Sequence, residues 1–296
     1  MNTVSPFTSL LGVDENGLGP LMGPLVVTGV LAEGAVPDHW PPGIEDSKRF
    51  FKSGSPVSFR RLEKTVLSFH QSAFGGIPAG PRPLIEALCG GIACAETASP
   101  CRDRLPTAFT VSPEERGETA SAFARWSREN GFRIKGIRCA VLCPKELNRR
   151  FSLGSLKSDV DLRLFGGIIA HFRRDGLDVA AGKIGGMKNY GDRLRCLFPG
   201  EQIAAGEETD AVSRYRFSGG GADWRLSFHL DVEEKSLPAC MASLVGKYVR
   251  EVFMESILET LSPGERVSGY RDVRTKAFLA RRPFPGVRNE CLVRTK

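Results

Sequence analysis

The sequence predicts an α/β fold with a central mixed β-sheet flanked by helices. Two apolar runs, Leu10 to Val13 and Leu25 to Leu31, flank a turn and have the pattern of paired strands. Apolar residues recur at helical spacing over 158–173, and a short strand pattern follows at 177–181. Strands that alternate with helices along a chain are typical of an α/β sheet.

The remaining elements are predicted from the same periodicities. In chain order they are a helix at 57–70, a helical patch at 84–88, a helix at 114–130, a strand at 132–142, a short helix at 190–197 and a strand at 224–232. Residues 71–106 are rich in glycine, proline and small side chains, so we expect an insertion around 71–130.

The clearest helical pattern spans residues 240–261. At about 100° per residue, one apolar face carries Met241, Leu244, Val245, Tyr248, Val249 and Val252. A polar stripe holds Ser243, Lys247, Arg250 and Glu251. By pattern alone this stripe can be a solvent-exposed face with an i, i+4 pair of Lys247 and Glu251.

Composition limits the class of protein. The chain has 296 residues, 41% of them hydrophobic, which suits one large or two small globular domains. No window approaches ~18 consecutive apolar residues, so no membrane span is expected. The first six residues lack a basic start and an apolar core, so no secretory signal is expected.

The eight cysteines favour a reduced, cytoplasmic protein. Cys139, Cys196 and Cys240 lie in or beside apolar runs, and a chain of this length needs no disulfides. A zinc site is conceivable where Cys89 is followed by two further cysteines. However, no Cys-x2-Cys pair or nearby histidine supports it.

Basic charge is concentrated at the C-terminal end. The formal net charge is +7, and the last 26 residues hold eight basic and two acidic side chains. We therefore treat 1–262 as one domain and 263–296 as a basic tail. Such a tail suits a polyanion, because neutralising phosphates releases counterions. A merely solvated tail is the alternative.

Two adjacent carboxylates, Asp14 and Glu15, end the first apolar run. The turn after them holds three glycines and two prolines before the second strand begins. An acidic pair at the open end of a sheet usually holds a hard divalent cation. The alternative is an ordinary hairpin with a solvated acidic turn.

Three ordered sequence blocks resemble the ribonuclease HII family. Asp-Glu-Asn-Gly-Leu-Gly-Pro-(x2)-Gly-Pro, from Asp14, is similar to the family's Asp-Glu-Ala-Gly-Arg-Gly-Pro-(x2)-Gly-Pro. Glu45 to Arg49 is similar to its Asp-Ser-Lys-Lys block. Ala242 to Glu251 resembles its Ala-Ser-(x2)-Ala-Lys-(x2)-Arg-Asp block, with glutamate in place of aspartate. The match covers the two ends well and the middle poorly.

This resemblance implies a ribonuclease H-like fold with an inserted segment, and a metal-dependent endonuclease. Family members cut the RNA strand of RNA–DNA hybrids, and they also cut at ribonucleotides embedded in duplex DNA. Four carboxylates position two Mg²⁺ or Mn²⁺ ions, about 4 Å apart in such sites. Paired cations offset the repulsion between phosphate and hydroxide.

The resemblance also assigns residues. It makes Asp14, Glu15 and Glu251 catalytic metal ligands. It places Gly17 and Gly19 at the substrate by close backbone approach. Phosphate or sugar contacts are implied for four further side chains, Ser47, Lys48, Lys247 and Tyr270. A helix cap with a solvated lysine is the alternative for the first two, and a core position is the alternative for Tyr270.

Two positions depart from the family pattern. The fourth carboxylate is expected after the 177–181 strand, where this chain has Gly182. Asp178 lies four residues earlier, inside the predicted strand, and Asp231 ends a different predicted strand; neither matches the motif. Leu18 also stands where the family has arginine, which indicates a divergent branch.

The sequence therefore leaves two functions open. The first is a ribonuclease of the ribonuclease HII type, impaired by Gly182, that acts on RNA–DNA hybrid or ribonucleotide-containing duplex. The second is a catalytically inactive protein of the same fold that binds nucleic acid. A small metal-binding α/β enzyme outside nucleic-acid chemistry has little support beyond the acidic pair.

Overall fold

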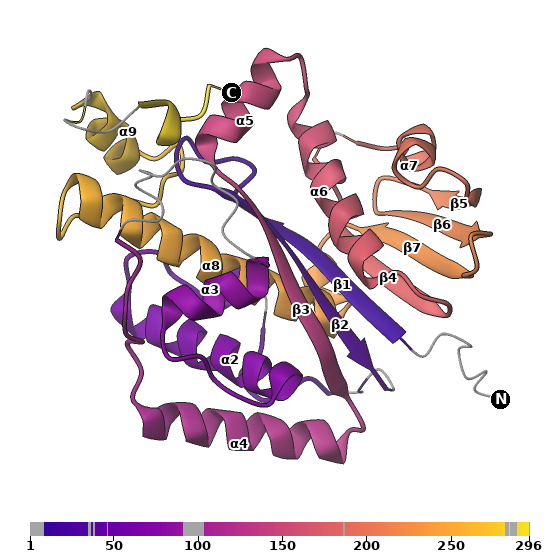
Figure 1. The fold of residues 1–296 in the computed structure, drawn as a ribbon, viewed down its shortest axis with the longest axis horizontal. Coiled ribbons are helices and arrows are strands. Elements are labelled where there is room, and N and C mark those ends of the chain that lie inside the picture. The colour runs from indigo at the N-terminus through magenta and orange to yellow at the C-terminus, as the bar shows by residue number, and fades with distance from the viewer. Residues whose placement is uncertain are drawn as a thin grey trace.

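A seven-stranded mixed β-sheet forms the centre of the protein (Figure 1). The computed structural model describes residues 9–34, 37, 39–45, 47–90, 104–185, 187–281, 284 and 289–295. The strands are β1 Ser9–Asn16, β2 Leu25–Glu33, β3 Arg133–Leu142, β4 Leu177–Gly182, β5 Gln202–Glu208, β6 Val212–Ser218 and β7 Trp224–His229. The predicted α/β class with a central mixed sheet and flanking helices is confirmed.

Strand order in the sheet is β3-β2-β1-β4-β7-β6-β5. β1 pairs antiparallel with β2 through the whole acidic end, from Ser9–Glu33 to Asn16–Val26. On its other side β1 pairs parallel with β4, and that pairing ends at Val13–Ala181. Asp14 and Glu15 therefore lie just beyond the last β1–β4 pair, where two parallel strands end together.

Helices cover the two faces of the sheet (Figure 1). α8, Leu237–Leu261, and α2, Pro56–Phe74, pack on one face against apolar side chains of β2 and β3. α6, Lys157–Phe172, packs on the opposite face against β1, β2 and β4. A Cβ added to Gly12 would lie 2.0 Å from the Ala239 nitrogen, so only glycine lets β1 approach the start of α8 so closely.

The expected insertion at 71–130 belongs to the same core. α3, Pro81–Cys89, and α4, Pro113–Glu129, carry buried Leu84, Leu88 and Phe123 into the cluster that holds α2 and α8. Ser112 and Glu115 form a capping box at the start of α4. Cys94 and Cys101 lie outside the described residues, and the six described cysteines form no disulfide with one another.

The C-terminal segment also packs on the domain. It contains α9, Val273–Ala280, and a short 3-10 turn, Asn289–Cys291. Val293 forms a β-bridge with Met22, and Arg294 is buried. This part of the predicted basic tail is therefore not simply solvated.

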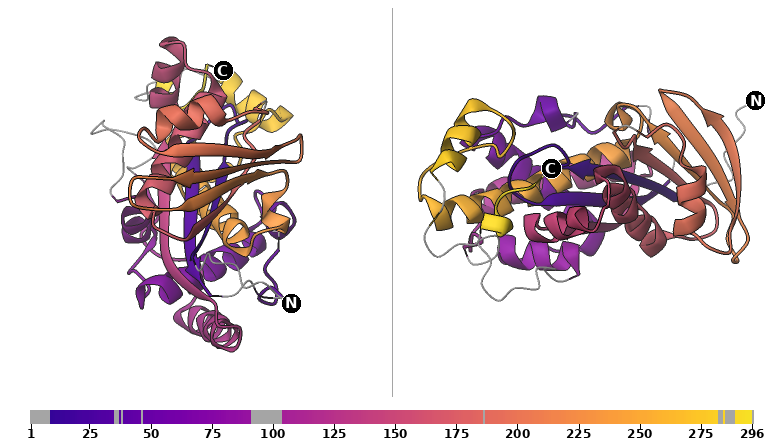
Figure 2. Two further views of the ribbon diagram at one scale, coloured as in Figure 1. Left: turned by 90° about the vertical axis from the view of Figure 1, so that its right-hand side faces the viewer. Right: turned by 90° about the horizontal axis from the view of Figure 1, so that it is seen from above.

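Several elements were not predicted. Among them are α1 Ser47–Phe50, α5 Pro144–Ser152 and the strands β5 and β6, whereas the short helix expected at 190–197 is α7, Gly191–Leu197. Figure 2 shows β5 to β7 at the end of the sheet away from α2 to α4. β7 ends at His229 rather than 232, because Asp231 takes a left-handed conformation (φ 51°) and a 3-10 turn, Val232–Glu234, follows. In the described residues no helix is long and apolar enough to cross a bilayer.

Candidate metal centre

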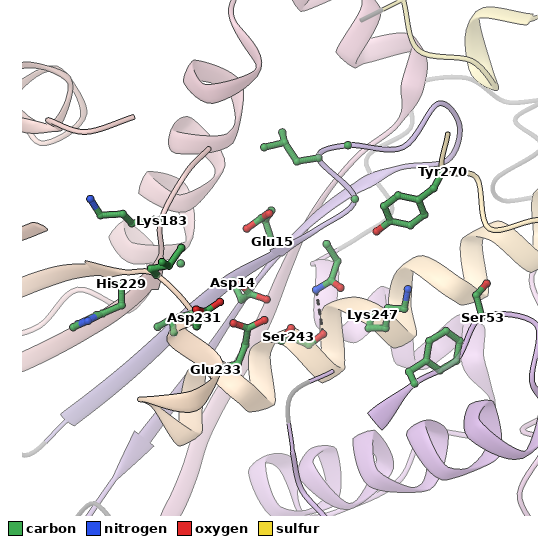
Figure 3. A pocket seen from close by; sticks show the side chains of 18 residues that line it. Asp14, Glu15, Ser53, Lys183, His229, Asp231, Glu233, Ser243, Lys247 and Tyr270 are labelled. Atoms are coloured by element: carbon green, nitrogen blue, oxygen red, sulfur yellow. Dashed lines mark hydrogen bonds between the residues drawn. The ribbon is translucent and has the colours of Figure 1, made fainter. Parts of the chain in front are cut away.

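A cavity of about 530 Å³ opens at the ends of β1 and β4 (Figure 3). It is lined by the acidic end of β1, the glycine turn that follows, the end of β4, the 229–233 segment and the polar side of α8. These segments are far apart in the sequence. The β1–β4 register and the packing of α8 on β1 bring them together.

Asp14 and Glu15 lie on opposite faces of β1, because successive strand residues alternate. Asp14 is 6% exposed and receives a hydrogen bond from the Ser243 hydroxyl of α8. The amide of Asn16, two residues further on the same face, donates to the Ser243 carbonyl at 3.1 Å. Ser243 and Asn16 thus fix the acidic end of β1 against α8.

Glu233 is a third carboxylate at the cavity and was not predicted. It lies in the 3-10 turn that joins β7 to α8, and only 7% of it is exposed. In Figure 3 its carboxylate points toward Asp14. A signal in the sequence could have found it: the Glu233-Glu234 pair immediately precedes the Ser236 cap and Pro238 of the long helix.

Burial and like charge act together on Asp14. Removal from solvent, followed by the charges of Glu15 and Glu233, raises the pKa of Asp14 well above its usual range. A cation bound among these three groups would favour the ionised form of Asp14. The chemistry of this donor set, all carboxylate and hydroxyl oxygen, fits Mg²⁺ or Mn²⁺.

The fit requires side-chain adjustment. Within the described residues no three His, Cys, Asp or Glu side chains already stand close enough to hold one metal ion. Like charges separate when nothing neutralises them, and carboxylates reorient by rotation about their side-chain bonds.

Gly182 lies beside the two β1 acids, at the end of β4. A Cβ built on it would be 3.0 Å from Asp14 Oδ1 and 3.8 Å from Glu15 Oε2. An aspartate at 182 would therefore place its carboxylate among these acids. Asp178 does not fill this position, because its carboxylate pairs with Arg225 Nη2 at 2.7 Å. Asp231 lines the cavity next to Glu233.

A further acid, Asp161 of α6, is buried near Asp14. It has no exposed surface, and neither carboxylate oxygen has a hydrogen-bond partner. Burial, followed by the charge of Asp14, raises the pKa of Asp161 to about 8. Sequence reasoning did not single out this residue.

Glu251 does not meet the β1 acids, contrary to the prediction. It lies eight residues beyond Ser243 on α8, about 12 Å along the helix, and is not among the cavity-lining residues. Its carboxylate lies 3.1 Å from Lys247 Nζ and 3.4 Å from Arg250 Nη1. We therefore assign Glu251 to ion pairing and Glu233 to the acidic group.

Arg250, which belongs to the polar stripe of the long helix, is completely buried, so the alternative of a solvent-exposed stripe does not hold for it. Its Nη2 donates to the carbonyls of Met22 and Ser268 at 3.4 and 3.3 Å. A Cβ on Gly17, which has φ 98°, would lie 2.7 Å from Arg250 Nε. Arg250 of α8 therefore holds the glycine turn in place. Position 17 needs glycine because its φ is positive and because a Cβ there would collide with Arg250.

Arg294 holds the same turn from the other side. It is buried, and it donates to the Gly23 carbonyl at 3.0 Å through Nε and at 2.6 Å through Nη2. Its Nη1 donates to the Gly17 carbonyl. Two arginines far apart in the sequence thus preorganise the turn at the cavity.

Four of the six residues predicted to contact substrate line the cavity, and the side chains of the other two lie outside the described part of the chain. Lys247 and Tyr270 line the cavity together with Gly17 and Gly19. The Lys247 ammonium lies 4.8 Å from the Phe51 ring centre, and Tyr270 is 41% exposed. Ser47 and Lys48 begin α1, and their side chains lie outside the described part of the chain.

Comparisons with known proteins give structural likeness only. No protein-family model matches the chain, and no curated protein sequence matches it. Among solved structures, the chain is similar to RNase HII from Archaeoglobus fulgidus in its PCNA complex, with 16% identity and TM-score 0.47. That match covers 97% of this chain and 94% of the other.

Two further structures are similar at the same level. Ribonuclease H2 from Pyrococcus horikoshii OT3 is 15% identical with TM-score 0.44, over 92% of this chain and 85% of that one. The Mn²⁺ complex of Bst-RNase HIII is 13% identical with TM-score 0.48, over 97% of this chain and 66% of that one. Likeness at this level says nothing about chemistry at the cavity.

Proposed function

We propose that the protein is a metal-dependent endoribonuclease that hydrolyses the RNA strand of RNA–DNA hybrids or cuts at a ribonucleotide in duplex DNA. The observation that carries the proposal is the meeting of Asp14, Glu15 and Glu233 at a cavity bordered by the Gly17–Gly19 turn. Carboxylates around a cavity large enough for a nucleotide suit phosphodiester hydrolysis.

Each acidic residue has a separate structural reason for its position. Asp14 is oriented by Ser243, Glu15 lies on the opposite face of β1, and Glu233 is presented by a 3-10 turn. Together they would hold Mg²⁺ or Mn²⁺, which when bound offsets the repulsion between a phosphodiester and hydroxide. One similar structure, Bst-RNase HIII, is described in complex with Mn²⁺.

The rim supplies groups that would bind the nucleic acid. Lys247 lies between Glu251 and the Phe51 ring, so its position is fixed and its ammonium can meet a phosphate at the rim. Tyr270 offers a partly exposed ring for stacking on a sugar or base. Nothing lies within 4 Å of a Cβ built on Gly19, so a strand can approach the turn's backbone there.

A binding protein without nuclease activity is the second candidate, and Gly182 favours it. The β4 position nearest to Asp14 carries no carboxylate, which removes one oxygen ligand from the expected set. Loss of a metal-site group typically reduces affinity or activity 10- to 100-fold. Binding to a hybrid through the rim would survive that loss.

Cleavage and binding of one labelled RNA–DNA hybrid, with Mn²⁺, separate the two candidates. The nuclease is supported if the wild-type protein cuts the RNA strand and Asp14→Asn does not, while both bind the hybrid. Asp192→Asn, which changes an exposed acid on α7, is the matched control and should cut normally. Tight binding without cutting supports the binding protein, and neither binding nor cutting contradicts both.

A further inference from the structure

Position 182, at the end of β4, carries no carboxylate of its own. Asp14, Glu15 and Glu233 line the same cavity. A buried carboxylate without partners lies in the neighbouring element, α6. This raises the question of whether α6 provides the group that β4 lacks.

The packing of α6 directs Asp161 toward the acidic end of β1. A Cβ on Gly29 of β2 would lie 2.3 Å from Ile168 Cγ2 and 3.4 Å from Leu11 Cδ1, so α6 crosses β1 and β2 here. Only residues 173–176 join α6 to β4, so α6 runs antiparallel to β4 and to β1. Asp161 lies seven residues before Ile168, about 10 Å back along α6, in the direction in which β1 reaches Asp14 and Glu15.

The electrostatics agree with this placement. The charge of Asp14 acts on Asp161, and the charge of Asp161 acts on Tyr190. The Tyr190 hydroxyl accepts a hydrogen bond from the Ile184 nitrogen, two residues beyond Gly182. Asp161 therefore lies between the end of β4 and the end of β1.

Asp161 is not satisfied by the protein itself. Both carboxylate oxygens are buried without a hydrogen-bond partner. Buried carboxylates normally accept several hydrogen bonds or bind a cation, because burying a bare charge is costly. An orphaned buried carboxylate near Asp14 is therefore available as a ligand.

We propose that Asp161 supplies the carboxylate that Gly182 lacks, so that Asp14, Glu15 and Asp161 share a divalent cation. In this proposal the carboxylate ligand comes from the buried side of α6 and not from the end of β4. The inference rests on the proposed function for the identity of the cation, and it assigns to this chain a ligand that no sequence motif indicates.

Mn²⁺ affinity, measured by the electron paramagnetic resonance signal of free Mn²⁺, tests the proposal without any nuclease assay. Asp161→Asn should weaken Mn²⁺ binding at least about tenfold. Asp159→Asn is the matched control on the same helix, because Asp159 pairs with Arg193 at 3.1 Å and faces solvent. The control should bind Mn²⁺ like the wild type.

Two further measurements separate a metal ligand from a merely structural group. Asp161→Asn should reduce the increase in melting temperature that Mn²⁺ produces, because the variant binds the cation more weakly. The double variant Asp161→Asn with Gly182→Asp should recover most of the lost Mn²⁺ affinity, because it returns a carboxylate to β4.

Unchanged Mn²⁺ affinity in Asp161→Asn overturns the proposal, as does an unchanged Mn²⁺-induced increase in melting temperature or a failure of the double variant to recover binding. If Asp14→Asn loses Mn²⁺ binding while Asp161→Asn retains it, the proposed function stands and this inference fails. If the wild-type protein binds no Mn²⁺, both fail.

Discussion

Two buried carboxylates on opposite sides of the sheet have opposite surroundings. Glu63 of α2 is 1% exposed, and its Oε2 accepts from the Thr110 nitrogen, the Thr110 hydroxyl and the Val111 nitrogen at 2.6, 2.6 and 3.0 Å. Its Oε1 accepts from the Tyr248 hydroxyl at 3.0 Å. Asp161 of α6 is as deeply buried and has no partner.

The difference separates a structural carboxylate from one reserved for a ligand. Glu63 joins α2, α8 and the segment before α4, and the protein supplies every hydrogen bond that its charge needs. The charges of Glu15 and Glu233 act on Asp14, which accepts a hydrogen bond from Ser243, and the neighbouring Asp161 has no hydrogen-bond partner. A cation among them would provide what the protein provides to Glu63.

The largest expected effect compares two glutamates of the α8 region. Glu233→Gln should lower Mn²⁺-dependent cleavage of a hybrid about 100-fold, because it removes a charge from the acidic group. Glu251→Gln should lower it less than about fivefold, because Glu251 only pairs with Lys247 and Arg250. Initial rates under one set of conditions measure both, and equal losses would contradict the assignment of Glu233.

Glu63→Gln tests the structural half of the comparison. The substitution removes the charge that four hydrogen bonds stabilise, and it turns an amide donor toward buried donors. It should therefore lower the free energy of unfolding by about 2–4 kcal/mol. Urea denaturation measures the change. A variant as stable as the wild type would show that the hydrogen bonds to Glu63 do not stabilise the fold, and the contrast between Glu63 and Asp161 would then fail.

Gly182→Asp should increase Mn²⁺ affinity about tenfold, by adding a carboxylate where the fold leaves space. Its Cβ would be 3.0 Å from Asp14 Oδ1, so Asp14 must move by a few tenths of an ångström. Gly185→Asp adds the same charge nearby, where a Cβ meets nothing within 4 Å, and should leave affinity unchanged. Equal gains in both variants would indicate a general charge effect.

The smallest expected effect concerns a surface carboxylate with partners. Hydrogen bonds from Arg149, and then from Arg150, lower the pKa of Glu146 from 4.5 to about 2. A depressed folded-state pKa adds stability above pH 4.5 that is lost as the pH falls toward 2. Glu146→Gln should remove this pH dependence, by less than about 1 kcal/mol since the pair is partly exposed. Unfolding curves at pH 6 and pH 3 test it.

The sequence predicted the sheet and its main helices because their periodicities are strong. The β1–β2 pair, α2, α4, β3, α6, β4 and α8 all occupy the expected ranges. β5 was missed because its side chains are almost all exposed, with no apolar alternation, and α5 because it is short and strongly charged.

The site was predicted where it depends on adjacent residues and missed where it depends on packing. Asp14 and Glu15 share a strand, so their proximity follows from the sequence. Glu233 comes to the cavity through a left-handed residue and a 3-10 turn, which no periodicity indicates. Asp161 lies on the buried side of an apolar helix, where only the crossing of α6 over the sheet shows what it faces.

Anomalous scattering from crystals soaked in Mn²⁺ tests the central claim most directly. The account predicts an Mn²⁺ peak about 2–2.5 Å from carboxylate oxygens of Asp14 and Glu15, with Asp161 or Glu233 completing the coordination. The absence of any peak at these carboxylates, or a peak bound only by Glu251, would contradict it.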